Sequence, residues 1–363
     1  MPEYAFTQVK DLKILRAKLP KCDSKSFLTS IISSLNASEP IHLKLNEDFI
    51  KSYGVKKVDC CYRTIRRIHG TDDRVQFSDS CVPFTGEHEL NKNTEHIFVE
   101  CNSNGQEVYS NAHAIITNRP KYEQRIKKSG IKAKKPYKVM MLGFDSFSRK
   151  NFRRGLPMSQ NYVHGKTEWF EMKGYTRIGN ETFSNLFAAL TGQSPKQKYK
   201  MCNPTEKTFL DDCQFVWGDF KKAGYITVFA EDQLTRSAFN VRHLGFQNQP
   251  TDHYFRPFVL AAEQTLDTKK LNDLVFCLGK SVYTDHIFVY ALKMVQIHET
   301  QPYFGVFYVN SLSNKQLSSS VVLDKKIAKS FVKVIEEKND NDMIMIYFGD
   351  TGTRFEEMPV RDI

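Results

Sequence analysis

The sequence predicts an α/β fold with a layered, largely parallel sheet, preceded by a smaller cysteine-containing region of strands and loops. From Tyr137 onward, apolar strand-like segments alternate with helical segments, as in a sheet that helices cover on both faces. Up to residue 118 the strand-like stretches are short and polar turns separate them, and five of the eight cysteines fall within the first 101 residues. We therefore expect a strand and loop region at 1–120, a basic linker at 121–136 and an α/β domain at 137–363.

Composition excludes two classes of protein. The chain is 40% hydrophobic and 26% charged, close to the average for soluble globular proteins. The longest apolar runs, such as 304–309 and 343–348, are much shorter than a membrane span, so a multi-span membrane protein and a disordered polymer are excluded. The stretch from Met1 to Arg16 has no apolar core, so no signal peptide is visible. The protein is then either cytosolic or its sequence starts downstream of its real beginning.

Three strands are expected in the first region, at Ile41–Leu45, Arg63–Ile68 and His96–Cys101. The cysteines of this region form no CxxC pair, which excludes zinc ribbons and thioredoxin-type motifs. Reduced thiols in a cytosolic protein are one interpretation. We favour disulfides, because cross-links stabilise a loop-rich region most.

Two features refine the cysteine prediction. Adjacent Cys60 and Cys61 should have different partners, because a disulfide between neighbours is strained. Cys202 and Cys213 enclose a loop of ten residues, and we expect them to pair.

Asn36-Ala37-Ser38 is a glycosylation sequon, which fits a glycoprotein.

A basic stretch from Lys121 to Lys138 accounts for a share of the net charge of +11, which results from 52 basic and 41 acidic side chains. Nucleic-acid binding would require interleaved aromatics and a recognisable module. The stretch has only Tyr122 and Tyr137, so we expect a solvated linker or a surface helix and no nucleic-acid partner.

The α/β domain is predicted from its apolar strands and from helix start and stop signals. Thr182 is expected to cap the first helix, and Gly192 and Gly224 to end the first two helices. The expected strands are Lys138–Phe144, Tyr225–Ala230, Tyr303–Val309 and Met343–Phe348, and the expected helices are Phe183–Leu190, Phe215–Ala223, Ile287–His298 and Val321–Glu336.

Polar groups follow each strand of the predicted sheet, namely Asp145, Asp232, Asn310 and Asp350. Ligands bind beyond the carboxyl ends of such strands. Asp145 and Asp350 are our candidate metal ligands, because two convergent carboxylates suit a hard cation or zinc. The alternative for either residue is an ordinary turn aspartate.

Thr182 is the candidate catalytic residue. A hydroxyl at a helix N-terminus is ordinarily a cap, but the N–H groups there also suit a phosphate or sulfate ester. A metal-bound threonine alkoxide at such a position can attack phosphorus.

Together these segments resemble the DUF229 family, an animal group of the alkaline-phosphatase and sulfatase superfamily, and the resemblance covers essentially the whole chain. The segments are DCCYRTIRR (59–67), EHIFVEC (95–101), FDSFSRKNFRR (144–154), GYTRIGNETFSNLFAALTGQ (174–193), DDCQFVWGDFKKAGYITVFAED (211–232), PTDHYFRPF (250–258) and FGDTGTR (348–354). The resemblance implies an alkaline-phosphatase-like fold, a metal-dependent ester hydrolase site that uses a divalent metal such as zinc, and a secretory-pathway location. It also implies that Thr182 stands at the nucleophile position and that Asp145 and Asp350 stand at metal-ligand positions.

The sequence departs from the family pattern at positions where metal-binding histidines are expected. Thr351 stands where relatives have a His, and Asn314, followed by Lys315, stands where they have His-Asp. A further His of the relatives would lie beyond Ile363, so the α/β domain is expected to be incomplete at its C-terminus. These losses weaken divalent binding. His253 matches the family and is expected to be structural.

The primary hypothesis is therefore a sulfatase- or phosphatase-like protein with impaired catalysis, secreted or luminal, without a membrane span in this chain. One alternative is an active secreted metal-dependent phosphoesterase or sulfatase. Another is a pseudoenzyme that holds an anionic ester or sulfated glycan with Thr182, the helix dipole and Arg149 or Arg177.

Overall fold

The computed structural model describes residues 21–33, 39–130, 136–165, 169–194, 202, 204–271, 274–312, 323–336 and 342–352. The glycosylation sequon at 36–38 and the predicted metal-ligand position Asn314 lie outside the described residues. Within the described ranges, no helix is both long enough and apolar enough to cross a membrane.

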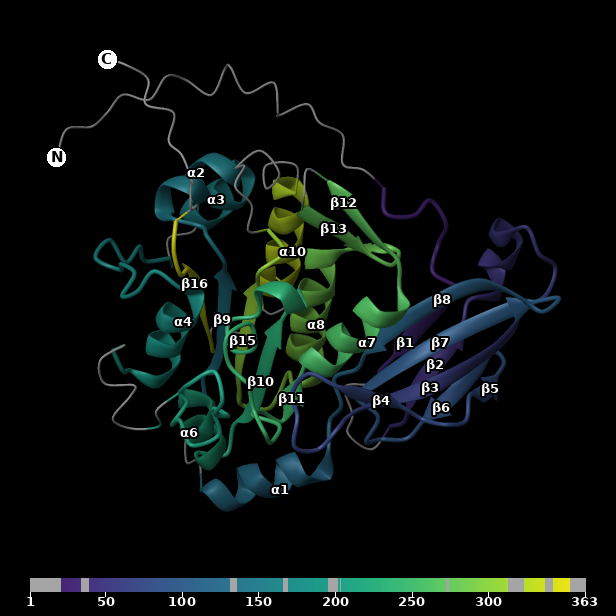
Figure 1. The fold of residues 1–363 in the computed structure, drawn as a ribbon, viewed down its shortest axis with the longest axis horizontal. Helices are drawn as coiled ribbons and strands as arrows, with labels where there is room; N and C mark the ends of the chain where they lie inside the picture. Colours follow the sequence, from purple (N-terminus) through teal and green to yellow (C-terminus); the bar gives the residue numbers. More distant parts are fainter. Residues whose placement is uncertain are drawn as a thin grey trace, which may run out of the picture.

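The N-terminal region consists of two antiparallel sheets, which Figure 1 shows on the right of the molecule. The first sheet has the order β1-β2-β6, and the second has the order β4-β3-β7-β8, with β5 also paired to β3. The elements are β1 (Thr29–Ile32), β2 (Ile41–Leu45), η3 (Glu47–Tyr53), β3 (Asp59–Arg67), β4 (Val75–Phe77), β5 (Val82–Phe84), β6 (Glu87–Leu90), β7 (His96–Ser103) and β8 (Gln106–Ala114). The three strands expected here are present, and β3 begins four residues earlier than predicted.

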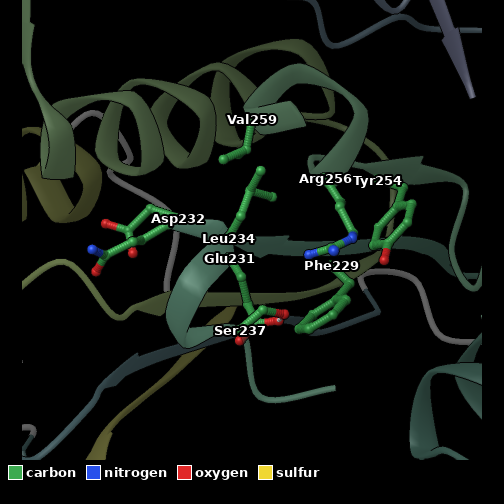
Figure 2. A pocket seen from close by; sticks show the side chains of 9 residues that line it. Phe229, Glu231, Asp232, Leu234, Ser237, Tyr254, Arg256 and Val259 are labelled. Atoms are coloured by element: carbon green, nitrogen blue, oxygen red, sulfur yellow. Dashed lines mark hydrogen bonds between the residues drawn. The ribbon is translucent and has the colours of Figure 1, made fainter. Parts of the chain in front are cut away.

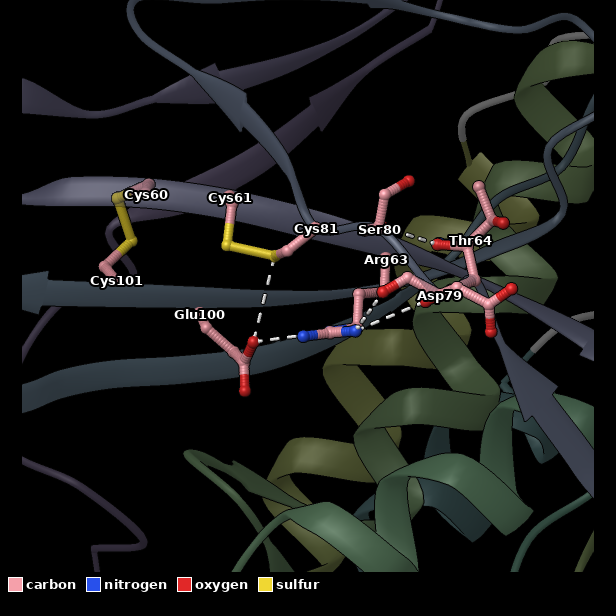
Figure 3. Close-up of a disulfide and its surroundings, with 10 residues drawn as sticks. Cys60, Cys61, Arg63, Thr64, Asp79, Ser80, Cys81, Glu100 and Cys101 are labelled. Carbon is pink, nitrogen blue, oxygen red and sulfur yellow. Dashed lines mark hydrogen bonds and ion pairs between the residues drawn. A yellow bond between two sulfur atoms is a disulfide. The ribbon is translucent and has the colours of Figure 1, made fainter.

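Disulfides cross-link this region, and the adjacent Cys60 and Cys61 have different partners, as predicted. Cys60 bonds to Cys101, and Cys61 bonds to Cys81 (Figure 3). Successive side chains of a strand point to opposite faces, so neighbours on β3 reach different partners. The Cys60–Cys101 bond is buried between the sheets, whereas Cys61 and Cys81 are only partly buried.

The four disulfides include all eight cysteines, so the structure has no free thiol. Cys202 bonds to Cys213 as expected from their spacing. Cys22 bonds to Cys277 across 255 residues and so ties the N-terminal region to the α/β domain. These bonds confirm the disulfide interpretation over reduced thiols.

The α/β domain is built on a five-stranded parallel sheet with the order β11-β10-β15-β9-β16. The strands are β9 (Lys138–Phe144), β10 (Ile226–Glu231), β11 (His253–Tyr254), β15 (Tyr303–Val309) and β16 (Met343–Gly349). The helices are α1 (Pro120–Ser129), α2 (Arg149–Gly155), α3 (Pro157–His164), α4 (Thr182–Thr191), α6 (Val216–Lys222), η4 (Leu234–Arg236), α7 (Arg256–Thr265), α8 (Tyr283–Ile297) and α10 (Asp324–Glu336). A small antiparallel sheet comprises β12 (Thr268–Leu271), β13 (Leu274–Leu278) and β14 (Ser281–Val282).

The central strands β10 and β15 are buried at every residue, which explains their largely apolar sequences, whereas Ile344 and Ile346 of the edge strand β16 are 45% and 42% exposed. On β15, Tyr303, Phe307 and Val309 pack in the core beneath α7, α8 and α10. Phe304 and Tyr308 point the other way, into the core beneath α4 and α6. The layered, largely parallel α/β fold predicted from the sequence is therefore confirmed (Figure 1).

The two regions share one interface. Helix α7 packs against β3, β7 and β8, and the core of the α/β domain continues into that sheet through Phe98 and Ala112. Asp72 is fully buried there and accepts hydrogen bonds from Asn240 (2.9 Å), the Phe246 amide (3.0 Å) and the Tyr254 hydroxyl (2.9 Å). The basic stretch that follows contains α1, which buries Tyr122 against the domain.

Candidate functional site

The candidate site lies at the carboxyl ends of β9 and β16. These two strands are parallel neighbours, and Gly349 stands opposite Phe144 in their register. Asp145 therefore follows β9 at the same edge where Asp350 follows β16. Both side chains are buried, since the two residues are only 7% and 2% exposed.

The loop after β9 is bent so that it reaches the second carboxylate. Ser146 adopts a positive φ of 62°, which is uncommon for a residue with a side chain. This conformation directs its N–H to Asp350 Oδ1 at 3.2 Å, while its hydroxyl donates to Asp145 Oδ1 at 3.2 Å. Gly349 allows the close approach, because a Cβ there would lie 1.8 Å from the Phe147 carbonyl oxygen.

Thr182 joins this cluster from α4, but not as a helix cap. Glu181 is the N-cap and Thr182 is the first helical residue, which corrects the sequence prediction. Its hydroxyl is engaged elsewhere and donates to Asp145 Oδ1 at 3.1 Å. Asn185 fixes the chain as it enters α4, because its Oδ1 accepts hydrogen bonds from the Ile178 and Gly179 amides at 2.8 and 2.9 Å.

The electrostatics of the cluster reflect two neighbouring carboxylates that are both buried. Burial and, after it, the neighbouring Asp145 carboxylate raise the pKa of Asp350, while the hydrogen bond from the Ser146 amide opposes that shift. Burial and the two carboxylates together raise the pKa of Tyr308. Within the described part of the chain, neither the Tyr308 hydroxyl nor Asp350 Oδ2 has a hydrogen-bond partner. A buried carboxylate oxygen without a partner is costly, so this geometry suits an additional positive group.

Tyr308 was not among the residues singled out from the sequence. It is one of seven consecutive buried residues of β15, and nothing in that apolar run distinguishes it. Its ring lies against Gly143 of β9, where a Cβ would be 2.3 Å from the ring. Only a residue without a side chain at position 143 allows this packing.

Of the two degenerate positions, Thr351 can be located. It is buried beside Asp350, with its hydroxyl 3.4 Å from Asp350 Oδ1. Its side chain adds another oxygen and no imidazole. Among the described residues, one group of three His, Cys, Asp or Glu side chains lies close enough together to hold a metal ion, namely Cys61, Cys81 and Glu100. The two cysteines of this group form a disulfide with each other.

The other strand-end groups form a separate, structural cluster. Asp232 accepts hydrogen bonds from the Asn310 and Ser311 amides at 2.6 and 3.0 Å, and burial raises its pKa to about 7. Figure 2 shows Asp232 with Glu231 and Arg256 around a small pocket at the end of β10. Because these hydrogen bonds occupy the Asp232 carboxylate, we assign it to loop structure.

The remaining candidates are two arginines and His253. Arg149 pairs with Glu171, which neutralises its charge, and Arg177 is exposed. His253 is fully buried, with its Nε2 3.2 Å from Nε2 of His298.

Comparison with protein families gives one further finding. A family model described as "Protein of unknown function (DUF229)" matches residues 16–361, nearly the whole chain. A search of curated proteins found no match.

Proposed function

The chain belongs to the DUF229 family, and we propose that it is a sulfatase- or phosphatase-like protein. In this proposal the cluster of Asp145, Thr182 and Asp350 binds one divalent cation but hydrolyses esters poorly. The observation that supports the proposal is the buried, unpartnered Oδ2 of Asp350 beside a second carboxylate and a helix-terminal hydroxyl. Such an arrangement is stabilised by a cation.

The donor atoms favour a hard cation over zinc. Asp145, Asp350 and Thr182 offer only oxygen, which suits Mg²⁺, Ca²⁺ or Mn²⁺. Tight zinc sites use imidazole or thiolate ligands, and Thr351 provides neither. When bound, a cation here would offset the charge of the two carboxylates and of an approaching anionic ester.

The chain's own residues would then hold the anionic group. The N–H groups of the first turn of α4 and the positive end of its dipole favour a phosphate or sulfate beside Thr182. Asp145 accepts the Thr182 hydrogen bond and so fixes the direction of the hydroxyl. A two-metal hydrolase needs enough ligands for both cations, and within the described residues this cluster has two carboxylates. Binding without efficient turnover follows.

We further propose a secretory-pathway location, extracellular or luminal. The support is that all eight cysteines are disulfide-bonded, because such bonds persist in oxidising compartments.

Cation titration by calorimetry tests the site. The proposal expects Mn²⁺ or Mg²⁺ to bind with one site per chain and Asp350→Asn to weaken binding at least about tenfold, which equals about 1.4 kcal/mol. Asp219→Asn on α6 is the control, because that carboxylate is exposed and outside the cluster. Equal binding by both variants would contradict the assignment.

Turnover of an aryl phosphate and an aryl sulfate tests the impaired catalysis. We expect no rate above background for the unmodified chain. Thr351→His should raise zinc affinity by adding an imidazole next to Asp350. Robust hydrolysis that Thr182→Ala abolishes would show that the cluster is an active site and that impairment is wrong.

The role of Tyr308 can be tested with a matched pair of variants. Tyr308→Phe removes the unpartnered hydroxyl that faces the Asp350 carboxylate, and we expect cation affinity to fall about tenfold because an oxygen that would face the cation is lost. Tyr303→Phe is the control, because this buried tyrosine of the same strand donates only to the Met343 sulfur, at 3.6 Å. Identical cation affinities would remove Tyr308 from the site.

A further inference from the structure

An apolar surface adjoins the candidate site. The segment 169–181, here called the α3–α4 loop, connects α3 to α4, and every residue from 170 to 178 is exposed. Four large apolar side chains project from it: Phe170 is 87%, Met172 79%, Ile178 57% and Tyr175 52% exposed. Large exposed apolar side chains gathered within one short segment indicate an interaction surface.

The loop is held in place at both ends. Glu171 forms ion pairs with Arg149 and Arg153 of α2, and the second contact measures 3.1 Å. Asn185 of α4 binds the backbone at Ile178 and Gly179. In Figure 1 the segment between α3 and α4 extends away from the sheet. The apolar side chains are therefore presented to solvent by an anchored structure.

Basic side chains accompany these apolar groups. Lys173 and Arg177 lie within the loop and are exposed. The acidic groups of the loop are offset, since Glu171 pairs with two arginines and Glu181 pairs with Arg242 at 3.4 Å. The surface is thus apolar and net positive, in a chain of net charge +11.

We propose that the α3–α4 loop docks on an anionic lipid bilayer surface. Phenylalanine and methionine side chains insert at the boundary of headgroups and acyl chains, and lysine and arginine are attracted to anionic headgroups. Exposed Lys173 and Arg177 beside exposed Phe170 and Met172 form the combination of basic and apolar side chains that binds anionic lipid surfaces. Tyr175 lies near Asp350, because burial and, after it, the Asp350 charge raise the pKa of its phenol, so docking brings the candidate site close to the lipid surface. The inference is independent of cation binding or turnover at that site.

Vesicle sedimentation with the full chain tests the proposal. Phosphatidylcholine vesicles that contain phosphatidylserine should bind the chain at least about tenfold more tightly than pure phosphatidylcholine vesicles. The double variants Phe170→Ser with Met172→Ser, and Lys173→Gln with Arg177→Gln, should each lose about tenfold in affinity. Val289→Ser on α8 is the control, because Val289 is similarly exposed, at 56%, outside the loop.

Tryptophan fluorescence provides a second readout, because the chain has two tryptophans and Trp217 is buried. Insertion of the loop should shift the emission of Trp169 to shorter wavelength on anionic vesicles. All proteins are first compared by circular dichroism, which verifies folding. Vesicle binding that Phe170→Ser with Met172→Ser leaves unchanged would show simple charge attraction and overturn the proposal. A concentration-dependent dimer that this variant abolishes, without vesicle binding, would identify a protein interface and overturn it also.

Discussion

Lowering the pH from 7 to 5 should lower the free energy of unfolding, because several buried histidines stay neutral in the folded protein. Burial lowers the pKa of His96, His113, His286 and His298 to about 4 each, and that of His253 well below its ordinary value of 6.5. These side chains stay neutral in the folded protein, whereas the unfolded chain binds their protons below pH 6.5. Their contribution to stability is therefore fully present above pH 6.5 and is lost progressively towards pH 4.

The magnitude for one histidine follows from linkage. At about 1.4 kcal/mol per pKa unit, a histidine of this kind costs about 2 kcal/mol of unfolding free energy at pH 5. Asp232 acts in the opposite direction, because burial raises its pKa to about 7 and the folded state takes up that proton first. The pH dependence of the whole protein combines both effects, so a single-site variant is needed to isolate the histidine part.

His96→Gln is that variant. His96 Nε2 donates to the Tyr254 carbonyl oxygen at 3.1 Å, and a glutamine amide can donate to the same oxygen without titrating. Urea unfolding at pH 7 and pH 5 should show that the variant loses about 2 kcal/mol less than the wild type between these values. His69→Gln, at an exposed histidine, should behave like the wild type. The same pH dependence in His96→Gln and the wild type would refute the reasoning.

Other predictions concern the regional interface, the disulfides and the net charge. Asp72→Ala should lower the free energy of unfolding by about 3–5 kcal/mol in urea, because buried donors and an arginine lose their carboxylate; a loss below about 1 kcal/mol would contradict this. Mild reduction followed by alkylation and mass spectrometry should label Cys61 and Cys81 before the buried Cys60 and Cys101, and the reverse order would disprove the role of exposure. The net charge of +11 should cause retention on heparin at low salt. Elution that does not depend on salt concentration would show that the net charge does not contribute to binding.

Local sequence was sufficient for the strands and for the position of the candidate residues along the chain. The runs 138–144 and 303–309 were predicted with the bounds of β9 and β15, because, apart from Lys138, they are continuously apolar, as strands buried on both faces are. Asp145 and Asp350 follow apolar runs of this kind, so both were expected at strand ends. The helices α2 and α3 were not predicted, since they are only seven and eight residues long. Helix α7 was not predicted because its apolar residues form one unbroken run, 257–262, which does not distinguish a helix from a buried strand.

Long-range contacts determined which candidate residues and which cysteines lie close together in the folded protein. The strand pattern alone does not distinguish Asp145 and Asp350 from Asp232, because all three follow apolar strands; the family resemblance favoured the first two. Asp232 is satisfied by amides of the loop after β15, whereas Asp350 Oδ2 stays unpartnered within the described residues, and that difference depends on which strands are neighbours. Spacing identified the Cys202–Cys213 bond, but a pairing across 255 residues, as in Cys22–Cys277, leaves no local signal because chain folding alone brings those sulfur atoms together.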